Sequence, residues 1–512
     1  MKLFTSFFAL AALVFALTSA AFASPHYTLI TILHTNDMHA QVMPRDASGG
    51  LARAATIIKQ IRADMPNVLL LDGGDIIHGS PEDYLSGGKA IISAMNVVGY
   101  EAVTTGNHEY DFGLDTLKNA MILAQFPFLA ANARSASGGQ WDRVEPYKIF
   151  TIDGVRVAVL GLTTLETISL HWPQSIKDIT IEDPMQVAAT YVPQLRKEAD
   201  VVVVLSHLGD VQDAILAQKV PGIDFIVGGH THTVINDWRW VGDTLITQAG
   251  SNAEYVGRID FIVKSDEQGK SIVSVNGKNG LWSDLVRQPL GKQYPPLPLI
   301  AVDASVPMDP AVVSAYMPYR KVADAQLSEV VGTATVDIPG RTRGSVESAA
   351  GDLVADAVRA LAKSDVALVD ASSVSESGLP AGPLTVGSAH NLIGGYTRQQ
   401  VVVCKMSGRD LEAAIVANIA RKHNLGLAVS GASVSYSSAD DVAVKINSAP
   451  IDPDKAYTVA AQAYVMMDIM QKVTGVTVLA GPNATTREAI AEYFRSQHTI
   501  KAPALDRVLR NK

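Results

Sequence analysis

The stretch LITILHTNDMHA, residues 29–40, is an apolar run that ends in a cluster of polar side chains. The apolar part predicts a buried strand, and Asp37 and His39 stand two residues apart just beyond it. Taken alone, the pair has an ordinary interpretation, a solvated turn in which Asp37 caps a helix. Metal binding is the alternative, so the other strand ends of the chain have to decide between them.

Five more apolar runs before residue 265 end in polar loops that lead into helix-like stretches. They are VLLLDGGD (68–75), YEAVTTGNHE (100–109), VRVAVLGLTT (155–164), DVVVVLSHLG (200–209) and DFIVGGHTHT (224–233). This alternation predicts a layered α/β domain built from βαβ units. In such domains the functional residues gather on the loops beyond the strand ends.

These strand ends supply the side chains that bind divalent metals. Nine of the twelve histidines precede residue 233. With Asp37 and His39, the potential ligands are Asp75, Asn107, His207, His230 and His232. Carboxylate, amide and neutral imidazole together suit Zn, Mn, Co or Fe. Seven ligands exceed the needs of one tetrahedral ion and fit two ions about 3.5 to 4 Å apart, the usual arrangement for hydrolysing phosphate esters.

Five ordered blocks resemble a known family. ILHTNDMHA, LDGGDIIHGSP, TTGNHEYDFG, SHLG and GGHTHT are similar, in order and spacing, to the blocks of the dinuclear metallophosphoesterases, and most of all to the 5'-nucleotidase and UDP-sugar hydrolase family. The resemblance implies an α/β fold with an N-terminal four-layer α/β/β/α metallophosphoesterase domain, a linker helix and an α/β 5'-nucleotidase-type C-terminal domain. It also implies attack of a metal-bridging hydroxide on phosphorus.

The resemblance assigns roles position by position. It implies one metal on Asp37, His39, Asp75 and His232, and a second on Asp75, Asn107, His207 and His230, with Asp75 bridging. His108 would face the substrate, where it stabilises the phosphoryl transition state or assists the leaving group, and Asp111 would orient it. For Asp111 alone, a carboxylate at a helix N-terminus is the alternative.

Three positions in these blocks need a separate interpretation. The family usually has Gly after the D-x-H block, where this chain has Ala40, and a methyl group there would tighten the loop without removing a ligand. His34 and His78 occupy positions that are not ligands, so we expect packing or support of the ligands from them.

The chain divides into regions by composition. Residues 1–23 have a basic Lys2, an apolar run and small residues at Ala21 and Ala23, which predicts a signal peptide, with a membrane anchor as the alternative. The metallophosphoesterase domain is predicted over 24–295, a Pro-rich linker with a helix from Ala311 to Leu327 over 296–330, and the second domain over 331–512. We expect the mature chain to be periplasmic or secreted, without a stable membrane anchor.

The second domain keeps the family's framework but not its recognition residues. The family usually has an arginine-bearing loop where this chain has DASSVSESG (370–378), and it clamps the base between two phenylalanines that NLGLAVSG (424–431) and AYVMMDIMQ (463–471) do not supply. Losing both features weakens nucleotide binding. Possible replacements, otherwise ordinary surface residues, are Arg341, Arg343, Tyr396 and Arg398. The sequence therefore assigns no substrate-binding residue.

Composition excludes several classes of protein. The formal net charge of −9 over 512 residues argues against a nucleic-acid-binding surface. The single Cys404 cannot form an internal disulfide, and the run VVVCKM makes it a buried strand residue without a function. No later stretch has the roughly 20 apolar residues of a membrane helix.

Three hypotheses follow from these observations. The first is a two-metal hydrolase of nucleotides or related phosphate esters. The second is a hydrolase on the same scaffold with another substrate, such as a 2',3'-cyclic nucleotide phosphodiesterase or a thiosulfohydrolase. The third is an inactive protein that binds metal or a partner, against which His108 and Asp111 argue because holding metal requires neither.

Overall fold

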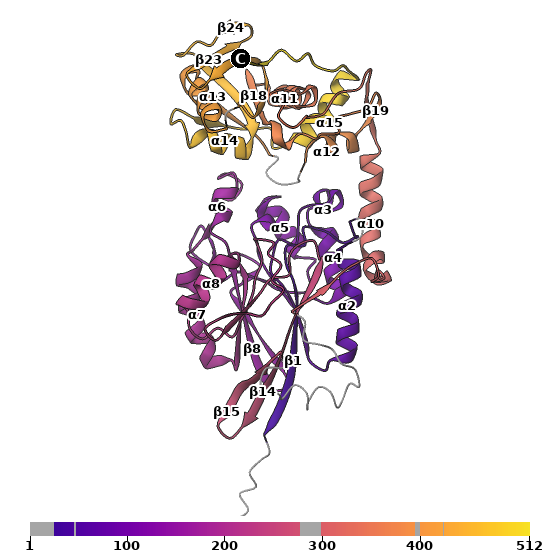
Figure 1. The fold of residues 1–512 in the computed structure, drawn as a ribbon, viewed down its shortest axis with the longest axis vertical. Helices are drawn as coiled ribbons and strands as arrows, with labels where there is room; N and C mark the ends of the chain where they lie inside the picture. Colours follow the sequence, from indigo (N-terminus) through magenta and orange to yellow (C-terminus); the bar gives the residue numbers. More distant parts are fainter. Residues whose placement is uncertain (1–24, 46–47, 277–297, 395–399, 423, 512) are drawn as a thin grey trace, which may run out of the picture.

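Two α/β domains joined by one long helix make up the structure (Figure 1). This computed structural model describes residues 25–45, 48–276, 298–394, 400–422 and 424–511. The expected signal peptide, Tyr396 and Arg398 lie outside the described residues. The predicted fold class is confirmed.

Two sheets packed face to face form the centre of the first domain. One sheet has the strand order β15-β14-β1-β2-β3-β4-β6, with β16 paired to β14, and the other has the order β12-β13-β11-β10-β8-β7. The strand bounds of the first sheet are Gly269–Val275, Tyr255–Asp266, His26–Thr35, Val68–Asp72, Ala102–Thr104, Phe128–Leu129 and Val144–Glu145, with β16 at Leu299–Ala301. Those of the second are Arg239–Val241, Thr244–Thr247, Phe225–Val227, Val201–His207, Val155–Thr163 and Tyr147–Ile152. A separate pair is β5 (Ala133–Ser135) with β9 (Ile179–Ile181).

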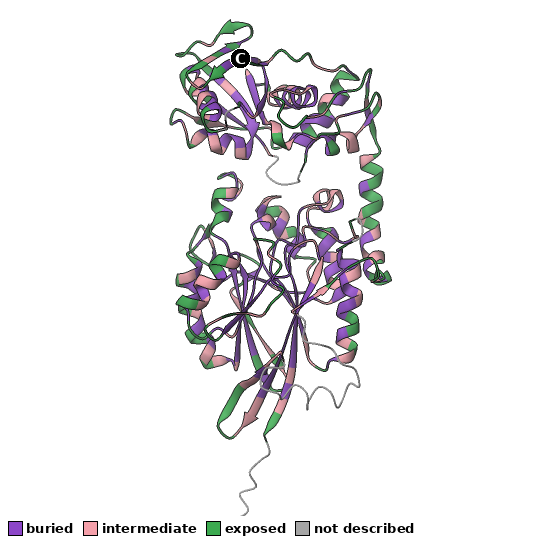
Figure 2. Ribbon diagram, viewed as in Figure 1, coloured by how far each residue is buried: buried purple, intermediate pink, exposed green. Residues whose placement is uncertain are grey.

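Helices cover the outer face of each sheet and complete four layers (Figure 1). The helices of this domain are α2 (Leu51–Asp64), α3 (Pro81–Ser86), α4 (Lys89–Val98), α5 (Leu114–Met121), α6 (Glu166–Leu170), α7 (Pro184–Glu198) and α8 (Asp210–Lys219). Figure 2 shows that the strands between the layers are buried while the helices expose one side. The pattern matches what amphipathic helices on a two-sheet core require.

Strand β1 shows why the opening stretch decides the fold. It lies between β14, to which it is antiparallel, and β2, to which it is parallel. Ile30 and Ile32 belong to the hydrophobic core between the two sheets, whereas Leu33 belongs to the core under the helices. Successive side chains of a strand point to opposite faces, so a strand buried on both faces must be apolar at nearly every position.

The linker helix α10 (Pro310–Leu327) begins one residue before the predicted Ala311 and ends at the predicted residue. The Asp309 side chain caps its N-terminus by accepting hydrogen bonds from the backbone N–H groups of Ala311 and Val312. Arg320 forms an ion pair of 3.1 Å with Glu82, which begins the short helix α3. The linker helix therefore contacts the first domain through Arg320.

The second domain has three small sheets and five helices among the described residues. Its sheets have the orders β21-β18-β25-β20-β26, β24-β23-β22-β28 and β19-β17-β27. In chain order the elements are β17 (Val330–Ala334), α11 (Ala349–Ala362), β18 (Val366–Asp370), β19 (Gly382–Thr385), α12 (Val386–Leu392), β20 (Val401–Ser407), α13 (Gly408–Lys422), β21 (Leu427–Ser430), β22 (Ala432–Ser438), β23 (Asp441–Ile446), β24 (Ala449–Pro450), β25 (Ala456–Gln462), α14 (Ala463–Met470), β26 (Thr477–Leu479), α15 (Thr486–Gln497), β27 (Thr499–Ile500) and β28 (Val508–Arg510). Cys404 is buried in β20, as predicted.

The two domains touch each other directly as well as through α10. The Tyr84 hydroxyl lies 2.8 Å from the Thr485 hydroxyl of the second domain. Trp172, on the loop after α6, is buried in the same hydrophobic cluster as Val402 and Met406 of the second domain. Within the described ranges, none of the helices combines the length and the apolar character needed to cross a membrane.

Candidate metal centre and catalytic pair

The predicted ligands lie on the loops that follow β1, β2, β3 and β11 and, for His207, at the last position of β10. Within each sheet these strands run parallel to one another, as the register of β1 with β2 and of β10 with β11 shows. The carboxyl ends of parallel strands meet at one edge, so the five loops converge. The structure thus brings six of the seven predicted ligands into two close groups, with Asn107 beside them.

The first group contains Asp37, His39 and His232, whose ligand atoms all lie within 4.8 Å of one another. The Nε2 atoms of the two histidines are 2.9 Å apart, and His232 Nε2 is 3.5 Å from Asp37 Oδ1. Asp37 is fully buried. This spacing brings a carboxylate and two imidazoles within reach of a single ion.

The second group contains Asp75, His207 and His230, and its ligand atoms also lie within 4.8 Å of one another. His207 Nε2 is 3.1 Å from Asp75 Oδ2, and the rings of His207 and His230 are 5.1 Å apart between centroids. The backbone N–H of His230 donates hydrogen bonds of 3.0 Å to both carboxylate oxygens of Asp37. The two groups are therefore adjacent.

Buried polar atoms without a hydrogen-bond partner test whether these residues fit a metal. Asn107 is 2% exposed, and its Oδ1 atom has no hydrogen-bond partner. Burying such an atom unpaired is costly, whereas Asn107 Oδ1 would be satisfied as a metal ligand. The donor set present fits divalent metals.

The loops that carry the predicted metal ligands, called the ligand loops below, adopt backbone conformations that L-residues rarely occupy. Positive φ angles between 45° and 81° occur at Asp37, His39, Asp75, His230 and His232. Each such residue costs on the order of 1 to 3 kcal/mol, and such strain concentrates at functional sites. Ala40 also has a positive φ, 57°, which explains why a glycine suits that position better.

Electrostatics within the site favour metal-binding forms of the histidines. Burial lowers the pKa of His39, His230 and His232, so these rings are neutral and carry a lone pair. Burial raises the pKa of Asp37 to about 7, although the nearby positive charge of His207 acts to lower that pKa. A bound divalent cation would supply the charge that keeps Asp37 ionised.

His108 and Asp111 form the predicted pair. His108 begins a short 3₁₀ turn (His108–Tyr110), and Asp111 follows that turn directly. His108 Nδ1 lies 2.7 Å from Asp111 Oδ2. Burial lowers the pKa of His108, but the negative charges of Asp75 and Asp111 outweigh it and raise that pKa to about 9. Asp111 therefore contacts His108 directly, and the geometry favours the orienting interpretation over the helix-terminus one.

Two residues that the sequence analysis did not assign support this site. Glu109 is fully buried and accepts hydrogen bonds from the backbone N–H groups of Asp75 (3.0 Å) and Ile76 (2.8 Å). His171 lies 3.0 Å from Asp111 Oδ1. Glu109 stands inside the TTGNHE block and could have been noticed there, whereas His171 follows no strand and carries no sequence signal.

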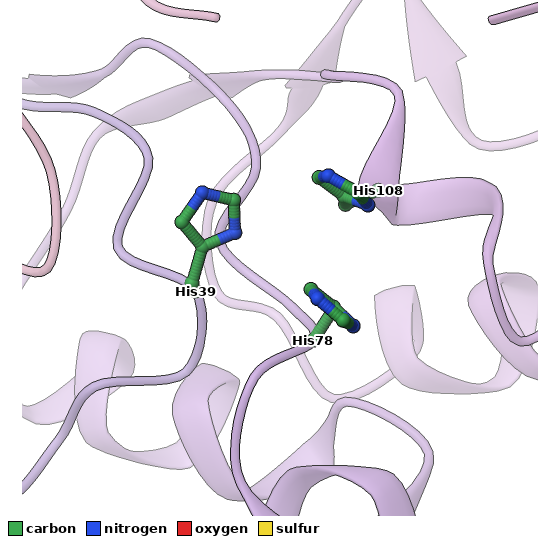
Figure 3. A group of neighbouring side chains, drawn as sticks. All are labelled: His39, His78 and His108. Carbon is green, nitrogen blue, oxygen red and sulfur yellow. The ribbon is translucent and has the colours of Figure 1, made fainter. Parts of the chain in front are cut away.

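The two histidines expected outside the ligand set behave differently. His34 is fully buried in β1, where neither ring nitrogen has a hydrogen-bond partner and burial lowers its pKa to about 3. His78 stacks on His108 with 4.6 Å between ring centroids and contacts the same carboxylate as His108, with its Nδ1 3.5 Å from Asp111 Oδ2. Figure 3 shows His78 and His108 side by side with His39 opposite, and these three also form a close group of potential ligands.

A cavity of about 510 Å³ lies beside Asp111 where the two domains meet. Its first-domain wall includes Tyr84, Phe112 and Trp172, and its second-domain wall includes Gln400, Asn483 and Thr485. Arg341 and Arg343 do not line it; Arg341 is paired with Glu376 at 2.7 Å, and Arg343 is exposed. The aromatic side chains beside the site therefore come from the first domain, a feature that the comparison of second-domain motifs did not predict.

Fold and site together define a metal-dependent hydrolase of phosphate esters. A match to the calcineurin-like phosphoesterase family covers residues 30–234, and a match to the 5'-nucleotidase C-terminal domain covers residues 330–473. The chain is 30% identical over 482 residues to protein UshA of Yersinia enterocolitica, covering 84% of each chain. It is also 30% identical to the 5'-nucleotidase of Vibrio cholerae, covering 70% of each.

A solved structure agrees with these sequence relatives. The 5'-nucleotidase precursor of Thermus thermophilus superposes with a TM-score of 0.65 at 23% identity, covering 95% of this chain and all of that one. That similarity concerns the fold. The chain belongs to the 5'-nucleotidase family of metallophosphoesterases.

Proposed function

We propose that this protein is a two-metal hydrolase of phosphate monoesters whose substrates are nucleotides or related esters. The observation that carries the proposal is the adjacency of two ligand groups, Asp37–His39–His232 and Asp75–His207–His230, next to His108. Asn107 would join the second group, and Asp75 would be shared by both ions. Divalent metals held there would activate water and neutralise charge on the phosphoryl oxygens.

The protein's own groups supply orientation and hydrogen bonding. Because Nδ1 of His108 faces Asp111, its Nε2 is directed toward the ligand loops and lies 3.9 Å from Asp75 Oδ2. A protonated ring in that place can donate a hydrogen bond to a phosphoryl oxygen or a proton to the leaving oxygen. An inactive metal-binding protein would have no use for this arrangement.

The cavity beside Asp111 favours an uncharged leaving group. Its described lining residues include the acidic Asp111 and Glu488 but no lysine or arginine. Phe112 and Trp172 offer aromatic surface, and Gln400 and Asn483 offer amide groups. A nucleoside or another neutral alcohol suits such walls, whereas a second anionic group on the substrate would lack a cationic partner.

A substrate screen of the mature protein loaded with Mn²⁺, Co²⁺ or Zn²⁺ tests this proposal. We expect hydrolysis of p-nitrophenyl phosphate and nucleoside monophosphates, with slower turnover of UDP-sugars and cyclic nucleotides. The Asp75→Asn variant should lose the activity because the shared carboxylate is weakened. A metal-loaded wild type that leaves every ester intact would refute the enzyme, and a preference for UDP-sugars or cyclic nucleotides would refute the assignment of substrate.

We also propose that the mature protein acts in the periplasm or outside the cell. The apolar, basic-flanked character of residues 1–23 supports this proposal. Cell fractionation with N-terminal sequencing of the exported chain tests it. We expect the mature chain to begin at Ser24, and recovery of an uncleaved chain from the cytoplasm would contradict the proposal.

A further inference from the structure

Asp111 is a buried carboxylate surrounded by imidazole rings. One oxygen, Oδ2, faces His108 Nδ1 at 2.7 Å and His78 Nδ1 at 3.5 Å. The other, Oδ1, faces His171 Nε2 at 3.0 Å. The side chain of Asp111 is only 3% exposed, so solvent contributes little to holding it. Its orientation depends on these neighbours.

Both ring nitrogens of His171 lie close to hydrogen-bond acceptors. His171 Nδ1 lies 2.7 Å from the carbonyl oxygen of Thr167, an atom that can only accept. Nε2 faces Asp111, which is ionised: burial opposes ionisation, but the charge of His108 and the hydrogen bonds from His108 and His171 hold the pKa of Asp111 well below its usual range. Nε2 of His171 therefore faces a charged acceptor, to which its N–H donates.

His171 is itself held in place from both sides. It is buried and follows α6, whose residue Thr167 accepts its Nδ1 hydrogen bond. The next residue, Trp172, is buried in the hydrophobic cluster of the second domain. A ring fixed in this way can in turn fix a carboxylate.

We propose that His171 is a positioning residue for the reaction. By donating to Asp111 Oδ1, it turns Oδ2 toward His108 and keeps the Nε2 atom of His108 directed at the ligand loops. His171 itself contacts neither the ligand groups nor His108 among the hydrogen bonds and ion pairs of the described residues. The inference rests on the proposed function, in which His108 acts at the phosphoryl group or the leaving oxygen.

Three substitutions separate the donor to Asp111 from the rest of the ring. His171→Gln places a side-chain N–H near the original Nε2, His171→Asn places one near Nδ1, and His171→Phe keeps the shape without a donor. With the Mn²⁺-loaded enzyme and p-nitrophenyl phosphate, we expect kcat to fall about 10- to 100-fold in the Phe and Asn variants at unchanged KM and metal content. His171→Gln should restore most of kcat.

A double-mutant cycle with Asp111→Asn distinguishes positioning from a general structural role. If His171 acts through Asp111, adding His171→Phe to Asp111→Asn should cause little further loss. Losses that multiply in the double variant would overturn the proposal. So would a His171→Phe enzyme with wild-type kcat, or one whose loss of activity equals its loss of bound metal.

Nitrogen-15 NMR of the histidine rings tests the inference without substrate. We expect the Nδ1 proton of His108 to exchange with water faster in His171→Phe than in His171→Gln. An unchanged His108 signal in His171→Phe would overturn the proposal. Because this measurement needs no turnover, its outcome is separate from a failure of the proposed function.

Discussion

At the scale of single residues, Asp75 connects every part of the site. Its carboxylate faces His207 Nε2 at 3.1 Å and accepts the backbone N–H of His108 at 2.8 Å. Its own backbone N–H is held by Glu109. Burial raises the pKa of Asp75, but the charges of His207 and His108 outweigh it and hold that pKa well below the usual range. An ionised, immobile carboxylate is what a shared metal ligand requires.

His108→Ala should remove the catalytic hydrogen bond without removing the metals. We expect kcat for p-nitrophenyl phosphate to fall by a factor of about 100 to 10,000, the usual range for a positioned acid or base. Metal content, measured by mass spectrometry, should stay at the wild-type value because His108 belongs to neither of the two groups proposed to hold the metals. Its own close group, with His39 and His78, contains only one of the seven proposed ligands. A variant with the wild-type rate would show that His108 has no role in turnover.

A buried acid of the second domain predicts how stability depends on pH. Burial raises the pKa of Asp352 to about 8, although the positive charge of Arg507 acts to lower that pKa. In the unfolded chain an aspartate ionises near pH 4, so between about pH 4 and 8 the folded state keeps a proton that the unfolded state releases. This contribution to stability is full below about pH 4 and is lost as the pH rises through 8.

Asp352→Asn should therefore stabilise the protein more at alkaline than at acidic pH. We expect the gain in Tm of the variant over the wild type to be larger at pH 8 than at pH 5, measured by differential scanning fluorimetry. Asp440→Asn, on an exposed turn, is the control and should show no such difference. Equal gains for Asp352→Asn at both pH values would contradict a protonated Asp352.

Sequence reasoning proposed residues that follow a recognisable pattern, and it missed a residue that only packing brings to the site. The seven proposed ligands stand at strand ends, where the alternation of apolar runs and polar loops makes them visible. His171 stands 60 residues after Asp111 in the chain, and only the folded structure brings the two within 3.0 Å. No local pattern in a sequence records such a contact.

At the scale of elements, the loop after β3 shows how closely the ligand loops approach one another. A Cβ atom on Gly106 would lie 2.1 Å from Asp75 Oδ1 and 2.7 Å from His207 Cε1. Both distances are far inside van der Waals contact. The glycine of TTGNHE is therefore required by space rather than by backbone conformation, a reason that the sequence alone does not reveal.

Gly106→Ala should displace Asp75, the ligand that we propose to be shared by both ions. We expect the affinity for Mn²⁺ to fall about 10- to 100-fold, as it does when the support of a metal ligand is lost, measured by isothermal titration calorimetry. Gly139→Ala is the matched control, because a Cβ there meets nothing within 4 Å. Wild-type affinity in Gly106→Ala would show that the loops can separate without cost to metal binding.

At the scale of the whole molecule, the predicted framework is confirmed, whereas the contacts at the domain junction were not predicted from the sequence. The alternating pattern predicted a layered α/β domain, because burial dictates where apolar residues stand. The four layers were implied by the family resemblance, and the Pro-rich linker indicated the helix that follows it. The cavity walls could not be predicted in the same way. They combine Tyr84, Phe112 and Trp172 of the first domain with residues of the second, and that pairing depends on how the domains meet.

The central claim is that loops at the ends of five strands build one site for two metal ions that hydrolyses phosphate esters. The most direct test is a titration of the metal-free protein with Mn²⁺, in which bound metal and hydrolysis of p-nitrophenyl phosphate are measured in the same samples. We predict that activity rises until two ions are bound per chain and then stays constant, and that Asp75→Asn never reaches this plateau. Full activity with one bound ion, or activity that survives complete removal of metal, would contradict the claim.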